Sequence, residues 1–131
     1  MDFETVRSFI VASGIVPKAT LKDDSENEID AIFLYSKPEE IEADQYLVYN
    51  FRLNSARVVR NYTFKSRVCS NDLLKAVELK DNVASLLDFY CRPVEIENFN
   101  KFRLSSEDGF NYDPETGFYI GMLSFDCNYI E

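Results

Sequence analysis

The fold is decided by residues 62–88, which read YTFKSRVCSNDLLKAVELKDNVASLLD. In residues 62–69 every second side chain is apolar or small, and this period of two predicts a strand. Its expected core-facing side chains are Tyr62, Phe64, Ser66 and Val68, and its outward ones are Thr63, Lys65, Arg67 and Cys69. After this strand, Asn71 or Ser70 is placed to cap a long helix that begins at Asp72.

The long helix is expected to end near Tyr90, because Pro93 marks its limit. Its apolar stripe consists of Leu73, Ala76, Val77, Val83, Ala84, Leu87 and Tyr90. A second helix is expected at residues 2–13, where apolar side chains again have helical spacing and Gly14 and Pro17 follow as stop signals.

The other apolar runs predict strands, which polar segments separate. Strands are expected at residues 29–35, 46–53, 57–69 and 118–130 and around Phe102–Leu104. The strand at 46–53 places Leu47, Tyr49, Phe51 and Leu53 on one face. Charged residues 18–28 and 39–44 predict exposed loops, Asn54–Ser55 predicts a break, and residues 105–117 predict turns. Gly121 indicates a bend or bulge in the last strand.

The order of these elements lacks the regular strand–helix alternation of a parallel sheet. We therefore expect an α+β fold with a mostly antiparallel sheet of four to five strands. An N-terminal helix and one long helix should pack on one face of it. At 131 residues, with 46% hydrophobic side chains and no internal repeat, the chain is expected to form a single domain over residues 1–131.

The net charge of −9 argues against non-specific binding to a phosphate backbone. No apolar run approaches the roughly 18 residues of a membrane span. The start Met1-Asp2-Phe3-Glu4 does not resemble a signal peptide. We expect a cytoplasmic protein without membrane contact or sequence-specific nucleic-acid binding.

Most catalytic chemistry is disfavoured by residues that the chain lacks. There is no His, which removes the commonest general base and most zinc sites. The four Gly residues form no phosphate-binding loop, and the three cysteines, Cys69, Cys91 and Cys127, are expected to be reduced core residues. The oxygen-rich stretch Asp108–Gly117 is better explained by turn chemistry than by a metal site. We therefore expect no cofactor, no metal and no enzymatic activity.

Charge is placed unevenly along the chain. Residues 22–44 hold nine acidic and two basic side chains, whereas residues 52–67 hold five basic and no acidic ones. The basic set is Arg52, Arg57, Arg60, Lys65 and Arg67, and the acidic set for partner docking is Glu39, Glu40, Glu42 and Asp44. These side chains either solvate exposed surfaces or bring the acidic loops of one copy to the basic strands of the next.

The strand, cap and helix of residues 62–88 resemble the central strand and helix of bacteriophage tail-terminator proteins, grouped in part as phage minor capsid proteins. The closing stretch Asp113–Tyr129 is similar to the last turn and strand of that family. The N-terminal helix before an acidic loop also fits. The first two matches cover about a third of the chain, and the element order extends the likeness to most of it.

The resemblance implies a virion protein assembled in the host bacterial cytoplasm. Such a protein closes into a ring, commonly a hexamer, on the head-proximal end of the tail tube. The ring stops tube polymerisation and presents the surface to which the head docks, and DNA passes through it. Its partners are itself, the tail tube protein and head-tail connector proteins. The basic set is then expected at subunit or lumen contacts, and the acidic set at a neighbour or the tube.

Three other interpretations stay open. One is a different phage neck component, such as a head-completion or connector protein. Another is a cytoplasmic small-ligand-binding domain with a cavity lined by some of Tyr49, Phe51, Phe64 and Phe125. The last is an enzyme that uses only carboxylates and tyrosines, which no residue spacing supports.

Overall fold

A computed structural model describes residues 3–56 and 59–130. The described residues form helices α1 (Phe3–Ala12) and α2 (Leu73–Leu87) and eight strands. The strands are β1 (Lys18–Leu21), β2 (Asp24–Asp30), β3 (Ile32–Leu34), β4 (Ile41–Glu42), β5 (Gln45–Ala56), β6 (Arg60–Ser70), β7 (Phe99–Asp113) and β8 (Phe118–Tyr129). They lie in two sheets, so the predicted α+β class is confirmed.

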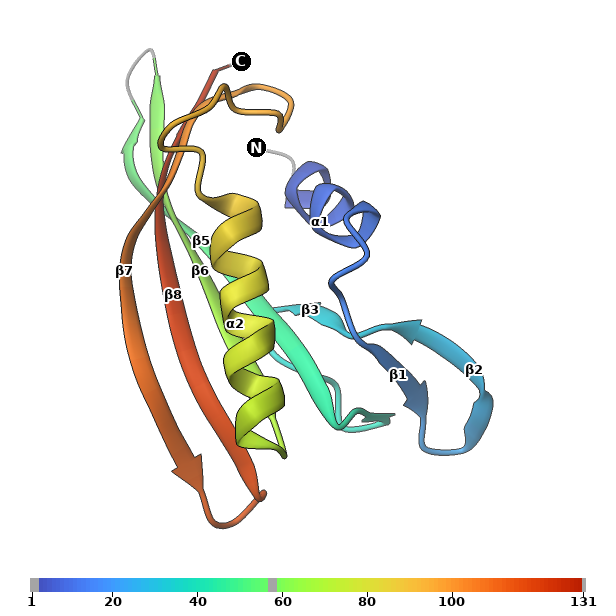
Figure 1. Ribbon diagram of the computed structural model, residues 1–131. Coiled ribbons are helices and arrows are strands. Elements are labelled where there is room, and N and C mark those ends of the chain that lie inside the picture. The colour runs from blue at the N-terminus through green and yellow to red at the C-terminus, as the bar shows by residue number, and fades with distance from the viewer. Residues whose placement is uncertain (1–2, 57–58, 131) are drawn as a thin grey trace.

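The larger sheet has the strand order β3-β5-β6-β8-β7. All its neighbouring strands are antiparallel except β3 and β5, which run parallel. Both helices lie on one face of this sheet, and α2 crosses β6, β8 and β7 (Figure 1). No helix formed by residues 3–56 and 59–130 lies on the opposite face, and we call it the helix-free face.

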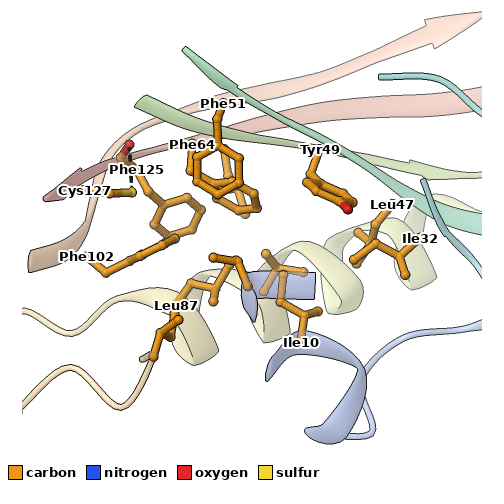
Figure 2. Packing of buried hydrophobic residues seen from close by; sticks show 14 of the residues in the cluster. Ile10, Ile32, Leu47, Tyr49, Phe51, Phe64, Leu87, Phe102, Phe125 and Cys127 are labelled. Carbon is orange, nitrogen blue, oxygen red and sulfur yellow. Dashed lines mark hydrogen bonds between the residues drawn. The ribbon is translucent and has the colours of Figure 1, made fainter. Parts of the chain in front are cut away.

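Between the sheet and the helices lies the main core, which is rich in aromatic side chains. Phe64 at its centre is fully buried, and its ring lies 4.8 to 6.0 Å, centroid to centroid, from the rings of Tyr49, Phe51, Phe102 and Phe125. Figure 2 shows these rings on the sheet side, facing Ile10 and Leu87 from the helices. The predicted core-facing set of β6 is confirmed, since all four of its side chains are buried. On β5, Leu53 instead is half exposed, because it lies near the strand end beside a bulge.

Helix α2 is capped by a different residue from those expected. The Asp72 carboxylate accepts a hydrogen bond from the Lys75 N–H at 3.2 Å, so Asp72, rather than Asn71 or Ser70, is the N-cap. The helix ends at Leu87, where the Arg92 guanidinium donates to the Ser85 and Leu86 carbonyls. Its buried side chains are Ala76, Leu79, Val83 and Leu87. Leu73, Val77 and Tyr90 are exposed, so the predicted stripe was wrong in those positions.

Residues 18–28, predicted to be an acidic loop, are largely strands, whereas in the predicted loop 39–44 only Ile41 and Glu42 form one. These strands form the smaller sheet, of order β2-β1-β4, in which Lys18 pairs with Asp30 and Leu21 pairs with Ile41. Its own small core consists of Ala19, Ala31 and Ile41, with Ile29, Phe33, Ala43 and Tyr46 packed against it. The prediction failed because β2 is exposed along most of its length, so its side chains carry no alternation of apolar and polar residues.

Two expectations for the larger sheet were wrong, and a third concerns residues that the structure does not describe. Asn54 and Ser55 do not break β5 but lie at a bulge, where the Asn54 amide donates to Asn61 and Thr63 of β6. The expected turns at 105–117 are mostly strand, because β7 continues to Asp113 through irregular register shifts. The expected strand start at 57 lies outside the described residues, and β6 begins at Arg60.

Gly121 was expected to mark a bulge, yet its strand pairs with β6 in regular register. The register shift lies instead in β7, between Asp108 and Asn111. Gly121 is needed because the Phe110 ring lies against it, and a Cβ at this position would stand 2.7 Å from that ring.

Cys69 and Cys127 are buried, as predicted for the cysteines, and burial raises the pKa of both thiols. Cys69 was also expected to face outward on its strand, but it is buried beside Tyr46. Cys91 is exposed, so the prediction of three core cysteines was wrong there. It lies in the irregular segment between α2 and β7, outside the core.

Candidate functional site

The smaller sheet gathers acidic residues that are distant in sequence. Strand β1 pairs with β2 on one side and with β4 on the other, which places residues 23–30 and 39–44 in one structural unit. Residues 18–44 hold nine acidic and three basic side chains. We call this unit the acidic sheet. One of its bases is already paired, since the Lys18 ammonium lies 2.7 Å from the Asp30 carboxylate.

The four acidic residues predicted to dock a partner all lie on this unit. Glu39, Glu40 and Glu42 are exposed. Their backbone is fixed to the rest of the sheet, because the Lys22 N–H donates to the Glu40 carbonyl at 2.8 Å. Asp44 is exposed too, and Asn71 donates to both its carbonyl and its carboxylate. The backbone that carries these carboxylates is therefore hydrogen-bonded to neighbouring segments, while the side chains face solvent.

The predicted basic set is divided by the structure. Arg52, Lys65 and Arg67 lie on the helix-free face, each pointing away from the core-facing neighbours on its strand. Arg60 is separated from Tyr62 and Phe64 by even numbers of residues along β6, so it lies on the side of the sheet that faces the helices. Arg57 lies outside the described residues.

Two further bases on the helix-free face were missed from the sequence. Lys101 and Arg103 of β7 lie opposite Asn128 and Asp126 of β8, on the same side of the sheet as Lys65 and Arg67. No sequence signal connected them to the basic set, because β7 joins that set only through its pairing with β8. We call Arg52, Lys65, Arg67, Lys101 and Arg103 the basic face.

Lys101 is neutralised within the chain, because its ammonium lies 2.6 Å from the Asp126 carboxylate. The Asn61 amide also donates to that carboxylate at 2.8 Å, and these two hydrogen bonds lower the pKa of Asp126. Across residues 3–56 and 59–130, neither Lys65 nor Arg67 has a carboxylate within ion-pair distance. Both cations thus remain available to an outside partner.

A depression of about 170 Å³ surrounds these two cations. Its lining is Tyr35, Val48, Asn50, Lys65, Arg67 and Met122. Tyr35 has a left-handed backbone with φ of 69°, which is strained for a residue with a side chain. Its carbonyl accepts a long hydrogen bond of 3.5 Å from Arg67. We call this depression the cationic pocket.

Tyr46 joins the acidic sheet to the helix-free face of the larger sheet. Its ring contacts Phe33 and Phe118 edge to face, and the Lys37 ammonium lies 5.8 Å from its centroid. Burial, aided by the neighbouring Cys69, raises the pKa of the Tyr46 hydroxyl to about 12. The hydroxyl stays protonated at neutral pH, and Tyr46 acts as a packing residue between the two sheets.

The part of the chain that the structure describes contains no group of three or more His, Cys, Asp or Glu side chains placed to hold a metal ion. In the Asp108–Gly117 stretch, the Asp113 carboxylate accepts from the Glu115 N–H and the Thr116 hydroxyl at 3.0 Å. Gly117 follows with φ of 77°. These contacts are those of a turn, and they already engage the Asp113 oxygens.

Neither a protein-family model nor a curated protein matches the chain. Among the described residues, neither helix is long and apolar enough to cross a membrane. The interpretation of function therefore rests on the surfaces described above.

Proposed function

We propose that the chain is a non-catalytic structural virion protein that assembles into a ring at the head-proximal end of a phage tail tube. The ring ends tube polymerisation and provides the surface to which the head docks. Its partners are further copies of the chain, the tail tube protein and head-tail connector proteins.

The observation that carries this proposal is the separation of opposite charges onto two surfaces of one chain. A head-to-tail ring needs two different, complementary surfaces on each subunit. The acidic sheet and the basic face satisfy this requirement, and complementary potentials favour correct pairing of subunits. Residues 62–88 and 113–129 resemble segments of tail terminators. The element order, with an N-terminal helix and a long helix on one face of a sheet, agrees with that resemblance.

A different neck protein, such as a head-completion or connector protein, is the second candidate, and it differs in its docking partner. The small-ligand alternative is weakened by the core itself. Tyr49, Phe51, Phe64 and Phe125, which were expected to line its cavity, pack against one another and against the helices (Figure 2).

Sedimentation of the purified chain over a wide concentration range, together with electron microscopy of the particles, tests the proposal. We expect a discrete closed ring of about six subunits. A chain that stays monomeric at every concentration, and also in the presence of tail tubes, contradicts it. Binding to connector rings but not to tail tubes would favour the second candidate.

A further inference from the structure

We infer that the cationic pocket receives a carboxylate side chain from the tip of the β1–β2 hairpin of a second copy of this chain. This inference rests on the self-assembly in the proposed function and assigns the contact that drives it.

The pocket has the chemistry of a carboxylate receptor. Lys65 and Arg67 are two residues apart on β6, so their side chains leave the same face about 7 Å apart. Asn50, directly opposite Lys65 on β5, adds an amide donor. Among the described residues, Arg67 donates one long hydrogen bond, to the Tyr35 carbonyl, so several of its five N–H groups can bind a carboxylate.

The size of the pocket favours the end of one side chain over a free ligand. Its volume of about 170 Å³ is below the roughly 300 Å³ at which small-molecule sites begin. Val48 and Met122 add apolar surface to the lining, so a carboxylate that enters loses part of its contact with water. Partial removal of water strengthens an ion pair relative to one on the open surface.

The hairpin tip, residues 22–27, supplies suitable carboxylates. Asp23 and Glu26 are exposed there. Asp24 is occupied within the tip, since its carboxylate accepts from the Glu26 N–H and the Asn27 amide. In Figure 1 the hairpin extends away from the larger sheet, so it can reach another molecule.

A nucleic-acid phosphate is the less favoured occupant. Tyr46 packs the acidic sheet against the larger sheet, so carboxylates lie near the edge of the basic face. A phosphate backbone carries a continuous row of charges that would meet these carboxylates on either side of the pocket, whereas a hairpin tip ends in a short acidic segment. The favoured partner is therefore a second copy.

A charge-swap experiment with the full chain tests this contact. The pocket variant is Lys65→Glu/Arg67→Glu, and the hairpin variant is Asp23→Lys/Glu26→Lys. The control variant, Lys75→Glu/Asn82→Glu/Ser85→Glu, makes the same change in formal charge as the pocket variant at three exposed positions of α2, outside both the basic face and the acidic sheet. Circular dichroism and thermal melts establish that each variant is folded.

We expect the pocket and hairpin variants, each alone, to raise the apparent Kd of self-association at least about tenfold, while the control stays near wild type. An equimolar mixture of the two should restore assembly, since a lysine-tipped hairpin fits the acidic pocket and the native contact forms in alternate interfaces. This rescue also proves that both variants retain the fold. The mass is measured by sedimentation at low and high salt.

The possible failures separate the two claims. If wild type forms rings and the pocket and hairpin variants do so with unchanged affinity, the pocket inference is wrong and the proposed function stands. If the wild-type protein forms open filaments whose assembly is lost in the pocket variant, the pocket inference is supported and the proposed closed ring is wrong. Variants that both weaken assembly but do not rescue each other exclude direct pairing of pocket and hairpin. Duplex DNA binding that is lost only in the pocket variant would identify phosphate as the occupant and overturn the inference.

Discussion

The two sheets of this molecule are built by opposite means. The larger sheet buries a continuous aromatic core under two helices, with Phe64, Phe102 and Phe125 fully enclosed. The acidic sheet has a core of three buried side chains, Ala19, Ala31 and Ile41, and β2 is exposed along most of its length. Since burial of apolar area is the main stabilising term, the free energy of folding is concentrated in the larger sheet. The acidic sheet buries little apolar surface, and most of its charged side chains are exposed to solvent and to binding partners.

Replacement of Phe64 by Ala should have the largest effect on stability. The ring contacts four other aromatic rings in a fully buried position, so we expect a loss of about 3–5 kcal/mol in the free energy of unfolding. Urea denaturation followed by circular dichroism measures it. Phe33→Ala, at a partly buried ring in the smaller core, serves as the control and should cost clearly less. Equal losses of unfolding free energy in the two variants would mean that the small core stabilises the protein as much as the main core, which would contradict the difference proposed above.

Ile41→Ala should loosen the acidic sheet alone. Ile41 is the largest fully packed side chain in its small core, and we expect a cost of about 2 kcal/mol. Hydrogen exchange should accelerate in β1, β2 and β4 and stay unchanged in β6 and β8, because local opening of the small sheet leaves the main core intact. Faster exchange throughout β6 would mean that the two sheets unfold as one unit.

Asp72→Ala removes the N-cap of α2 and should cost about 1 kcal/mol. The Lys75 N–H would lose its acceptor while the core below stays packed. A thermal melt beside Asp81→Ala, an exposed position further along the helix, isolates the capping effect. If both variants melt at the same temperature, the cap makes no contribution.

The smallest effect should come from Asp126, whose carboxylate accepts hydrogen bonds from Lys101 and Asn61. These lower its pKa below the ordinary value of 3.8, so its stabilising effect is complete above that value. It is lost as the pH falls through the lower pKa of the folded state. Because the pair is partly exposed, we expect less than about 1 kcal/mol.

Denaturation of wild type and Asp126→Asn from pH 7 to pH 2 tests this contribution. The difference in stability should be constant near neutral pH and shrink at the acid end. A difference that grows as the pH falls would give the opposite sign and refute the assignment.

The larger sheet was predictable because its buried face imposes alternation on the sequence. Tyr62, Phe64, Ser66 and Val68 follow that rule, and all are buried. The acidic sheet escaped prediction because a strand with little buried surface needs no such pattern, as β2 shows. The extent of β7 was hidden for a related reason, since its register shifts put successive residues out of phase.

The candidate site was only partly accessible from the sequence. Arg52, Lys65 and Arg67 could be placed on one outer face from their spacing along two neighbouring strands. Lys101 and Arg103 join that face only through strand order, and Tyr35 reaches the pocket only through a left-handed backbone. The positions of these three residues depend on how segments distant in sequence pair with one another. The spacing of residues along the sequence does not reveal that pairing.

The central position of β8 has a consequence for synthesis of the chain. Strand β8 lies between β6 and β7, although it is the last of the described strands to leave the ribosome. Until then β6 has an unpaired edge, β7 lacks its neighbour, and the Phe64 and Phe102 rings lack their contacts with Phe125. Such a nascent chain exposes apolar surface and a free strand edge, both of which promote aggregation. Rapid translation through Phe118–Tyr129, or protection by a chaperone during it, should therefore raise the yield of folded protein.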